Sequence, residues 1–385
     1  MHSEAENIRP DFQLKSRKIS LFLPSLDGGG AERVFVQLAN EFAASGFRVD
    51  FTLASARGPY LQALSARVRV IDFHASGVFR ALPKLIGYLK RERPDVLMSG
   101  LDHANIVAIL SHFLSGSRTR CVISVRAVPS AHHGNDRTLA SWVTLRSIKA
   151  AYRFADGVIA NANAVAADLA GFVPKNRLNT IYNPVDQAWI QRRGSMSVDH
   201  PWCSAGAVPI VLSVGTLTLR KDFFTLVRAF SIVRARRNCR LVILGEGPDR
   251  EKLEALIDEL DLGRDALLPG FADNPFAWMR HAGVFVSSSR HEGCPNALME
   301  ALACGTPVVS TDCIGGSSEV LEGGKWGRLV PVGNPDAMAA AILATLESVA
   351  HPDVRQRASD FGPAHIAGDY LRVLLPGVAP AAQER

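Results

Sequence analysis

The chain has 385 residues, of which 47% are hydrophobic and 21% charged, and its formal net charge is +6. A chain of this length is usually too long to fold around a single hydrophobic core, so we expect two domains in a soluble globular protein. The longest apolar stretch, residues 106–114, is broken by His112 and is too short to span a bilayer. Glu4, Glu6 and Asp11 precede the first apolar run and argue against a signal peptide, so we expect a cytoplasmic protein.

Neither a disulfide framework nor a metal site is indicated by the sequence. The six cysteines form no Cys-x-x-Cys pair and no ligand-like cluster with histidine, which favours a reduced compartment. No Asp-x-Asp motif follows an expected strand, because Asp27 and Asp102 each stand alone. We therefore expect no cofactor and no bound metal.

The charge is unevenly distributed along the chain. Residues 1–195 hold 25 Lys and Arg against 15 Asp and Glu, whereas residues 196–385 hold 18 against 22. Solvated faces alone would explain this difference. An alternative is that the basic half meets an anionic partner, either a membrane surface or a diphosphate-linked acceptor. We rank nucleic acid below both, because no aromatic residues interleave with the dispersed charges.

Short apolar runs alternate with helical periodicity through the first half of the chain. Strands are expected at 18–24, 47–53, 95–99, 120–125 and 157–160, and helices at 31–44 and 105–114. This alternation predicts a parallel, doubly wound sheet. It stops at Asn183-Pro-Val-Asp186, and the following residues, 187–208, are rich in Arg, Ser and Gly and suggest an interdomain linker.

The same alternation restarts after the expected linker. Strands are expected at 209–214, 239–245, 266–269, 283–286 and 308–310, and helices at 223–236 and 253–260. A second α/β domain of similar size to the first therefore follows it in the chain.

The most informative segment runs from Glu292 to Glu300. It follows an apolar strand and a serine turn, and Pro295 then starts a short helix that ends before Gly305. Ligands bind at such strand-to-helix junctions, where helix N–H groups face a phosphate. Those groups would belong to Asn296, Ala297 and Leu298. We expect Glu292 to reach a sugar hydroxyl from the loop, and Glu300 to accept from a ribose.

A second junction carries two adjacent cations. Gly215 ends an expected strand, and Arg220 and Lys221 precede the next helix. Alone, this pair would more often simply begin an exposed helix. Beside a matching glutamate pair, two cations at a strand end suit the growing charge of a departing diphosphate, without a metal.

A glycine triplet, Gly28 to Gly30, lies at the first strand-to-helix turn. Glycines there let the backbone approach a ligand and leave helix N–H groups available to an anion, so Gly29 and Gly30 are donor-binding candidates. A tight turn would need glycine in any case. The Gly-x-Gly-x-x-Gly spacing of a dinucleotide site is absent.

These motifs together resemble the family 4 glycosyltransferases. The resemblance runs from Ser25 to about Tyr370 and is strongest over 214–330; it departs at Thr216, where the family often has Arg. It implies a retaining enzyme of GT-B fold, with two facing Rossmann-like domains and a cleft between them. The implied domains are residues 1–190, on the acceptor side, and 205–360, which would bind a nucleotide sugar. The last helix, about 362–376, would pack back on the first domain.

The resemblance also suggests roles for isolated residues. A lone histidine is more often structural, but relatives carry one near His103 that contacts the donor sugar. Phe271 would border the nucleotide base. Arg126 lies at a strand end suited to an acceptor phosphate, and Asn105 is a weaker acceptor candidate.

We therefore predict a hexosyltransferase that uses a nucleotide sugar, with UDP favoured over GDP. It would transfer a hexose or N-acetylhexosamine to a saccharide or polyprenyl-diphosphate-linked saccharide in cell-surface polysaccharide or lipopolysaccharide synthesis. Such an enzyme would work at the cytoplasmic face of the inner membrane as a peripheral protein, without nucleic acid. Two alternatives stay open: an epimerase or glycogen-synthase-like enzyme of the same fold, and a non-catalytic nucleotide-sugar-binding protein.

Overall fold

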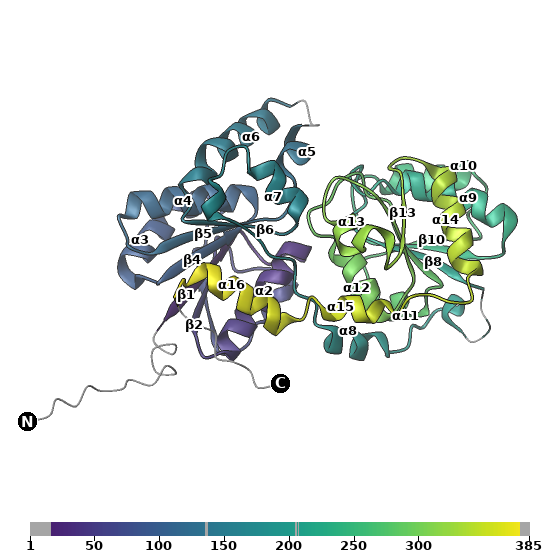
Figure 1. Ribbon diagram of the computed structural model, residues 1–385, viewed down its shortest axis with the longest axis horizontal. Coiled ribbons are helices and arrows are strands. Elements are labelled where there is room, and N and C mark those ends of the chain that lie inside the picture. The colour runs from purple at the N-terminus through teal and green to yellow at the C-terminus, as the bar shows by residue number, and fades with distance from the viewer. Residues whose placement is uncertain (1–16, 135–137, 205, 207, 378–385) are drawn as a thin grey trace, which may run out of the picture. The chain divides into compact units, whose positions relative to one another are not determined.

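The computed structural model describes residues 17–134, 138–204, 206 and 208–377 (Figure 1). Contacts divide these residues into two compact units. The first comprises the described residues up to Asn161, Val165–Pro184 and the segment from Pro363; the second comprises Ala162–Ala164 and Val185–Gly362. The acidic N-terminal residues of the signal-peptide argument lie outside the described part. Within that part, no helix combines the length and apolar character needed to cross a bilayer.

The first unit is built on a seven-stranded parallel sheet in the order β3-β2-β1-β4-β5-β6-β7. Its strands are β1 (Lys18–Leu23), β2 (Arg48–Leu53), β3 (Val68–Asp72), β4 (Val96–Gly100), β5 (Arg120–Val125), β6 (Gly157–Ala160) and β7 (Leu178–Thr180). The central strands are buried on both faces, which is why their sequences are continuous apolar runs. The chain reverses direction across the sheet between β1 and β4, so this is the switch point where ligands bind in such folds.

The helices of the first unit lie between these strands in the chain, except for α16, which follows the second unit. They are α2 (Gly30–Ala44), α3 (Leu82–Glu92), α4 (Asp102–Ser115), α5 (Pro129–Gly134), α6 (Leu139–Ala151), α7 (Asn163–Leu169) and α16 (Pro363–Leu374). Short 3-10 turns lie at Pro59–Ala63, Val78–Ala81, Tyr152–Phe154 and Lys175–Arg177.

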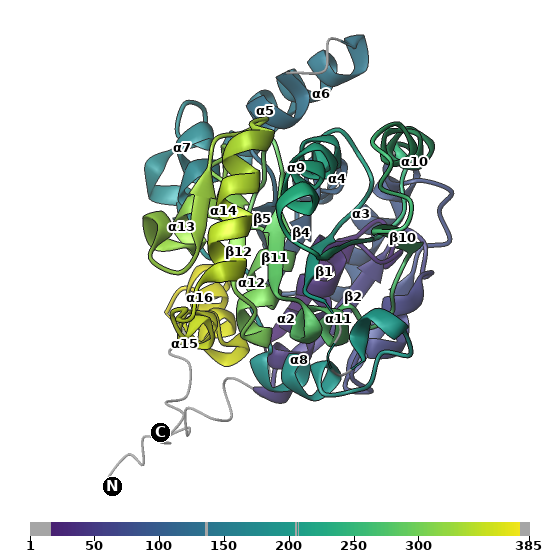
Figure 2. The ribbon, with the colours of Figure 1, turned by 90° about the vertical axis from the view of Figure 1, so that its right-hand side faces the viewer.

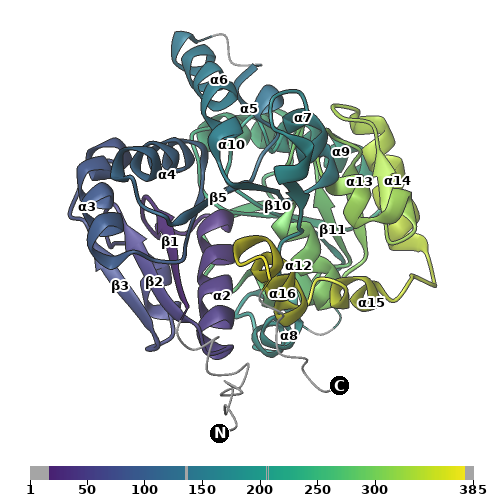
Figure 3. The same ribbon diagram turned by 60° about the vertical axis from the view of Figure 1, so that its left-hand side comes forward.

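The last helix completes the core of the first unit. Ile366, Tyr370 and Leu374 of α16 are buried in one cluster with Phe35 and Leu38 of α2. The two helices lie side by side in Figure 3. The first unit is therefore assembled from both ends of the chain.

The second unit has a six-stranded parallel sheet in the order β10-β9-β8-β11-β12-β13. Its strands are β8 (Ile210–Val214), β9 (Arg240–Leu244), β10 (Ala266–Gly270), β11 (Val284–Ser287), β12 (Val308–Thr311) and β13 (Arg328–Val330). Here the switch point lies between β8 and β11.

The helices of the second unit are α8 (Gln187–Gly194), α9 (Phe223–Arg236), α10 (Arg250–Glu259), α11 (Pro275–His281), α12 (Asn296–Cys304), α13 (Ser317–Val320), α14 (Pro335–Glu347) and α15 (Val354–Ser359). Two 3-10 turns lie at Pro201–Cys203 and Glu322–Gly324. Helices α9 and α14 pack against each other (Figure 2) and contribute Phe230 and Ile342 to the core.

The expected irregular linker at 187–208 begins instead with helix α8 (Gln187–Gly194), which belongs to the second unit. The Asp186 carboxylate caps this helix by accepting from the Trp189 N–H group at 2.9 Å. The Trp189 ring packs edge-on against Phe276 of α11, with ring centroids 5.1 Å apart. Helix α8 has few apolar residues, set among Arg and Gly. They are sufficient to hold a short helix because α11 provides an apolar surface on which they pack.

Candidate functional site

The second unit holds a buried cluster of charges around Glu292. Its carboxylate accepts from Lys221 Nζ at 2.6 Å on one oxygen and from Arg220 Nη1 at 2.8 Å on the other. The Ser289 hydroxyl donates to the first oxygen at 2.6 Å. Only 6% of Glu292 is exposed. The structure therefore joins three residues that the sequence placed at two separate strand ends.

The environment fixes the charge state of Glu292. Burial alone would raise the pKa of this carboxyl group, but the charges of Lys221 and Arg220 and the bonds from Lys221 and Ser289 outweigh it and lower the pKa to about 2. The group is thus a carboxylate throughout the physiological pH range. It is suited to orienting donors and cations, and unsuited to giving or taking a proton.

A tight turn after β8 presents the two cations. Asp222 adopts the left-handed region with φ of 49° and begins helix α9, where its side chain accepts from the Thr225 hydroxyl at 3.0 Å. Arg290 Nε donates to the same carboxylate at 3.1 Å. A non-glycine residue in this region costs about 1–3 kcal/mol, so these bonds must enforce it. Arg220 and Lys221 are held at the sheet edge as a result.

Glycines let two loops of this edge interlock. Gly245 has φ of +137°, and a Cβ atom there would lie 2.0 Å from the Gly215 carbonyl oxygen. A Cβ atom at Gly215 would itself touch the Lys221 side chain at 3.0 Å. The small residues therefore allow the Lys221 stem to pass along the backbone of the β8 end.

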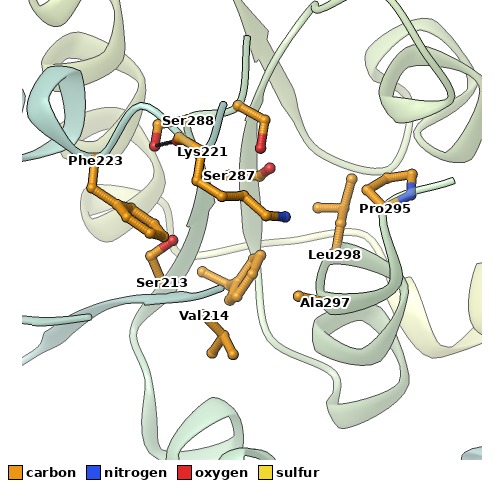
Figure 4. A pocket seen from close by; sticks show the side chains of 11 residues that line it. Ser213, Val214, Lys221, Phe223, Ser287, Ser288, Pro295, Ala297 and Leu298 are labelled. Atoms are coloured by element: carbon orange, nitrogen blue, oxygen red, sulfur yellow. Dashed lines mark hydrogen bonds between the residues drawn. The ribbon is translucent and has the colours of Figure 1, made fainter. Parts of the chain in front are cut away.

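A small pocket opens between these cations and the start of helix α12. Its lining includes Ser213, Lys221, Ser288, Ala297 and Leu298. The Lys221 side chain extends across it toward the first turn of α12 (Figure 4). The first-turn N–H groups of an α-helix lack acceptors within the helix, and the helix dipole is positive there. Cation and helix end thus favour an anion at this place.

Two further donor-site candidates lie on the second unit. Glu300 is one turn inside α12 and 7% exposed. Phe271, directly after β10, has 70% of its surface exposed. An aromatic side chain left this open at a sheet edge offers a flat surface for stacking.

The glycine turn of the first unit is closed by an internal carboxylate. Gly29 caps helix α2, and a Cβ atom there would meet Glu32 Oε2 at 2.3 Å. Glu32 lies at the third helical position, where an acidic side chain folds back over the helix end. Burial raises the pKa of Glu32, with Asp27 adding to the rise, against the lowering effect of its backbone N–H bond and of Arg126. The expected open anion site at Gly29 and Gly30 is therefore covered by Glu32.

His103 lies in the first turn of helix α4 with an exposed side chain whose ring centroid is 5.6 Å from that of Phe79. The preceding Leu101 has φ of 73°, which is strained for a non-glycine residue. Such strain often accompanies a functional turn, and here it sets the direction in which α4 leaves strand β4.

The two predicted acceptor residues have different surroundings. Arg126 Nη1 donates to the Tyr370 hydroxyl at 3.2 Å, and its Nη2 has no hydrogen-bond partner among the described residues. Asn105 is fully buried and bonds Ser99, the Ser124 carbonyl and Tyr152. It holds α4 to the sheet, so we withdraw it as an acceptor contact.

Sequence reasoning missed Ser289 and Glu32. The sequence predicts only a serine turn at this point, although the Ser289 hydroxyl, in the turn after β11, is placed to bond Glu292. Glu32 follows the glycine triplet at the spacing of a helix-capping carboxylate, and that spacing was the available signal. Within the described residues, no three His, Cys, Asp or Glu side chains gather as a metal site would require.

Comparison with known proteins shows the family to which the chain belongs. Residues 28–189 match the sequence profile of Glycosyltransferase Family 4, and residues 208–348 match that of Glycosyl transferases group 1. A Campylobacter jejuni protein named N-acetylgalactosamine-N,N'-diacetylbacillosaminyl-diphospho-undecaprenol 4-alpha-N-acetylgalactosaminyltransferase is 30% identical over 376 residues, which cover 93% of this chain and 100% of that one. This chain belongs to glycosyltransferase family 4.

Two further proteins are similar to this chain, one in sequence and one in structure. The lipopolysaccharide core biosynthesis glycosyltransferase LpsE of Rhizobium meliloti is 27% identical, covering 89% of this chain and 92% of that one. The structure of Anabaena Alr3699/HepE in complex with UDP and glucose has a TM-score of 0.76 at 20% identity, covering 94% of this chain and 100% of that one. Together with the two parallel sheets, this likeness confirms the predicted GT-B fold class.

Proposed function

We propose that this glycosyltransferase moves a hexose or N-acetylhexosamine from a UDP-sugar to a lipid-diphosphate-linked saccharide, with retention at the anomeric carbon and without a metal ion. One observation carries the proposal: the Arg220–Glu292–Lys221 cluster lies beside the start of α12. The comparisons lend no support to the epimerase or to the non-catalytic alternative.

The cations would stabilise the leaving diphosphate. As the bond between the anomeric carbon and the phosphate oxygen breaks, negative charge grows on that oxygen. A Lys ammonium has three donors and an Arg guanidinium five, so both retain donors while bonded to Glu292. Preorganised cations in a site of low dielectric stabilise such charge without reorganising during the reaction.

Glu292 would hold the cations and the sugar. Its carboxylate fixes Arg220 and Lys221 in place and stays ionised, because its pKa is about 2. We assign it sugar hydroxyls as hydrogen-bond donors. Glu300 would accept from the ribose, Gly215 would leave room for the donor, and Phe271 would stack on the base. The Asn296–Leu298 turn of α12 would take the diphosphate.

The first unit would take the acceptor side. Arg126 Nη2 is buried and has no hydrogen-bond partner within the described part of the chain, so Arg126 would bind an acceptor phosphate. His103 is exposed and would contact the donor sugar. A lipid-diphosphate acceptor is supported by the name of the Campylobacter relative, and the basic balance of residues 1–195 fits such an anion. Work on that acceptor would place the protein at the cytoplasmic face of the inner membrane.

The decisive experiment is a transfer assay. Purified protein is incubated with a panel of UDP-, GDP- and ADP-sugars and a polyprenyl-diphosphate-linked saccharide, and products are followed by mass spectrometry. We expect a lengthened acceptor and stoichiometric UDP. An isomerised donor with no lengthened acceptor would identify an epimerase, and donor binding without turnover a non-catalytic protein.

Retention and metal independence have their own readouts. NMR coupling constants of the new linkage report its anomeric configuration, and inversion relative to the donor would contradict the mechanism. Transfer in EDTA should equal transfer without it. Loss in EDTA and recovery with Mn²⁺ would overturn the assignment of leaving-group stabilisation to Arg220 and Lys221.

A further inference from the structure

Helix α6 of the first unit projects from the body of that unit (Figures 1 and 2). Thr138 caps its start by accepting from the Ser141 N–H group at 3.2 Å. Its other end is anchored by Ile148 and Tyr152, which are fully buried, and the Tyr152 hydroxyl donates to Asp102 at 2.9 Å. The helix is therefore a capped, fixed element whose first half extends outward.

The outward face of α6 is apolar at its tip. Leu139 is 76% exposed, Trp142 53% and Val143 49%. With 3.6 residues per turn, these three side chains, together with Arg146 and Lys149, fall within an arc of about 120°. Ile148 and Tyr152 point to the opposite side, so this face is a second apolar face, distinct from the one that packs on α4. We call Leu139, Trp142, Val143, Arg146 and Lys149 the α6 face.

The charged residues of the α6 face are all cationic. The Arg146 guanidinium lies 4.6 Å from the centre of the Trp142 ring. Lys149 follows one turn later and is exposed. No Asp or Glu occurs between Thr138 and Ala155. Leucine, tryptophan and valine at the tip with basic residues behind them form the pattern of a helix that lies in a lipid interface.

We propose that the α6 face docks on an anionic lipid surface, with Trp142 and its apolar neighbours entering the headgroup region and Arg146 and Lys149 binding lipid phosphates. The choice of a lipid over a protein partner rests on charge complementarity and on the proposed function, since a lipid-linked acceptor lies in such a surface. Three apolar side chains give weak, reversible attachment, which lets the enzyme leave the membrane between turnovers.

Vesicle sedimentation tests the proposal directly. The full chain is mixed with vesicles of phosphatidylcholine alone, or with about a third phosphatidylglycerol, and no saccharide or nucleotide is present. We expect binding to the anionic vesicles that weakens as salt rises. The Leu139→Ser/Trp142→Ser variant should lose at least about tenfold in partition coefficient. Because no acceptor is present, failure of the transfer reaction would leave this result unaffected.

A charge reversal with a matched control locates the contact. Arg146→Glu/Lys149→Glu should weaken binding by on the order of tenfold or more. Arg67→Glu/Lys90→Glu makes the same charge change at exposed residues elsewhere in the first unit and should change binding by less than about threefold. Equal losses in both variants would show that net charge, and not the α6 face, drives binding, and would overturn the proposal.

Fluorescence and oligomeric state separate the remaining outcomes. Brominated lipids should quench wild-type emission, and the quenching should fall in Trp142→Phe, which leaves the other four tryptophans in place. Absence of binding at low salt would also overturn the proposal. If light scattering shows a dimer that Leu139→Ser/Trp142→Ser abolishes, the α6 face binds a second copy of this chain and the lipid proposal is wrong. Unchanged melting temperatures confirm that the variants fold.

Discussion

Each unit carries a glutamate at a strand-to-helix junction beside its switch point, but their surroundings differ. Glu292 of the second unit is bonded by two cations and a hydroxyl, and its pKa is lowered to about 2. Glu32 of the first unit folds over the start of α2, and burial raises its pKa. Of the strand ends that flank the two switch points, the one after β11 thus holds a permanent anion, and the one after β1 holds a carboxyl group nearer to protonation.

This difference in charge suits the two units to different ligands. Under the proposed function, the fixed carboxylate of the second unit would organise two cations for a strongly charged diphosphate. In the first unit, a carboxyl group whose pKa is raised by burial would suit neutral hydroxyl groups, which under the proposed function belong to the saccharide acceptor. Substitutions at the sheet edge of one unit should therefore change turnover or stability by a different amount, and in one case in the opposite direction, from substitutions at the other edge.

The largest expected effect comes from Lys221→Met, which removes one cation and keeps the apolar stem. Turnover should fall on the order of 10²- to 10³-fold, because loss of one such group removes about 3–4 kcal/mol of transition-state stabilisation. Steady-state kinetics of transfer would measure it. Lys252→Met, at an exposed position on α10, is the control and should keep wild-type turnover. Equal turnover in the two variants would contradict the assignment of Lys221.

Glu292→Gln should destabilise the protein at neutral pH. Removing one partner of a buried ion pair leaves uncompensated charge, and we expect a loss on the order of 3 kcal/mol. The folded-state pKa is depressed, so this contribution is full above about pH 4.5 and is lost as the pH falls toward about 2. Thermal unfolding of both proteins from pH 8 to pH 3.5 should show the difference shrink below about pH 4.5. A difference that grows on acidification would contradict the linkage.

Two glycine substitutions compare how tightly the backbone is constrained at the sheet edges of the two units. Gly245→Ala should cost about 3 kcal/mol or more, because it combines φ of +137° with a Cβ atom 2.0 Å from the Gly215 carbonyl oxygen. Gly29→Ala should cost less than about 1 kcal/mol, because φ is −76° there and the close atom is the flexible end of Glu32. Urea unfolding would measure both. Similar costs would show that the two loops are equally constrained.

The smallest effect has the opposite sign. Glu32→Gln keeps the hydrogen-bonding capacity at the start of α2 but removes a charge that burial disfavours. A raised folded-state pKa means that the native state loses stability as the pH rises through it, so the variant should be equal or slightly more stable at pH 8. The gain should not exceed about 0.5–1 kcal/mol. Calorimetry at pH 8 would test it, and a clear loss would show that Glu32 is paired in solution.

Sequence patterns predicted the central strands and the helices that place an apolar face in the core. The expected strands at 120–125 and 157–160 and the expected helix at 223–236 agree with β5, β6 and α9 residue by residue. These segments have strong apolar signals because they lie within a core. Strand β3 was missed, because it is an edge strand with one buried residue and a sequence, Val-Arg-Val-Ile-Asp, that mixes charged and apolar residues.

The sequence predicted only part of the candidate site, and the reason differs from that for the missed strand. Arg220, Lys221 and Glu292 were predicted because sheet edges bring strand ends together, which topology alone decides. The bonds from both cations to one carboxylate depend on side-chain directions that spacing does not encode. Asn105 was misjudged because its place one turn inside α4 turns its amide into the core, a fact that needs the position of Tyr152.

The returning helix α16 sets the order in which this protein can be made. Its side chains fill the core of the first unit, yet residues 185–362 are synthesised before it. At roughly 5–20 residues per second, a ribosome needs on the order of ten seconds or more for that stretch. During this interval the apolar side of α2 around Phe35 lacks its cover. A nascent chain of this kind is therefore a natural client for chaperones until its final residues emerge.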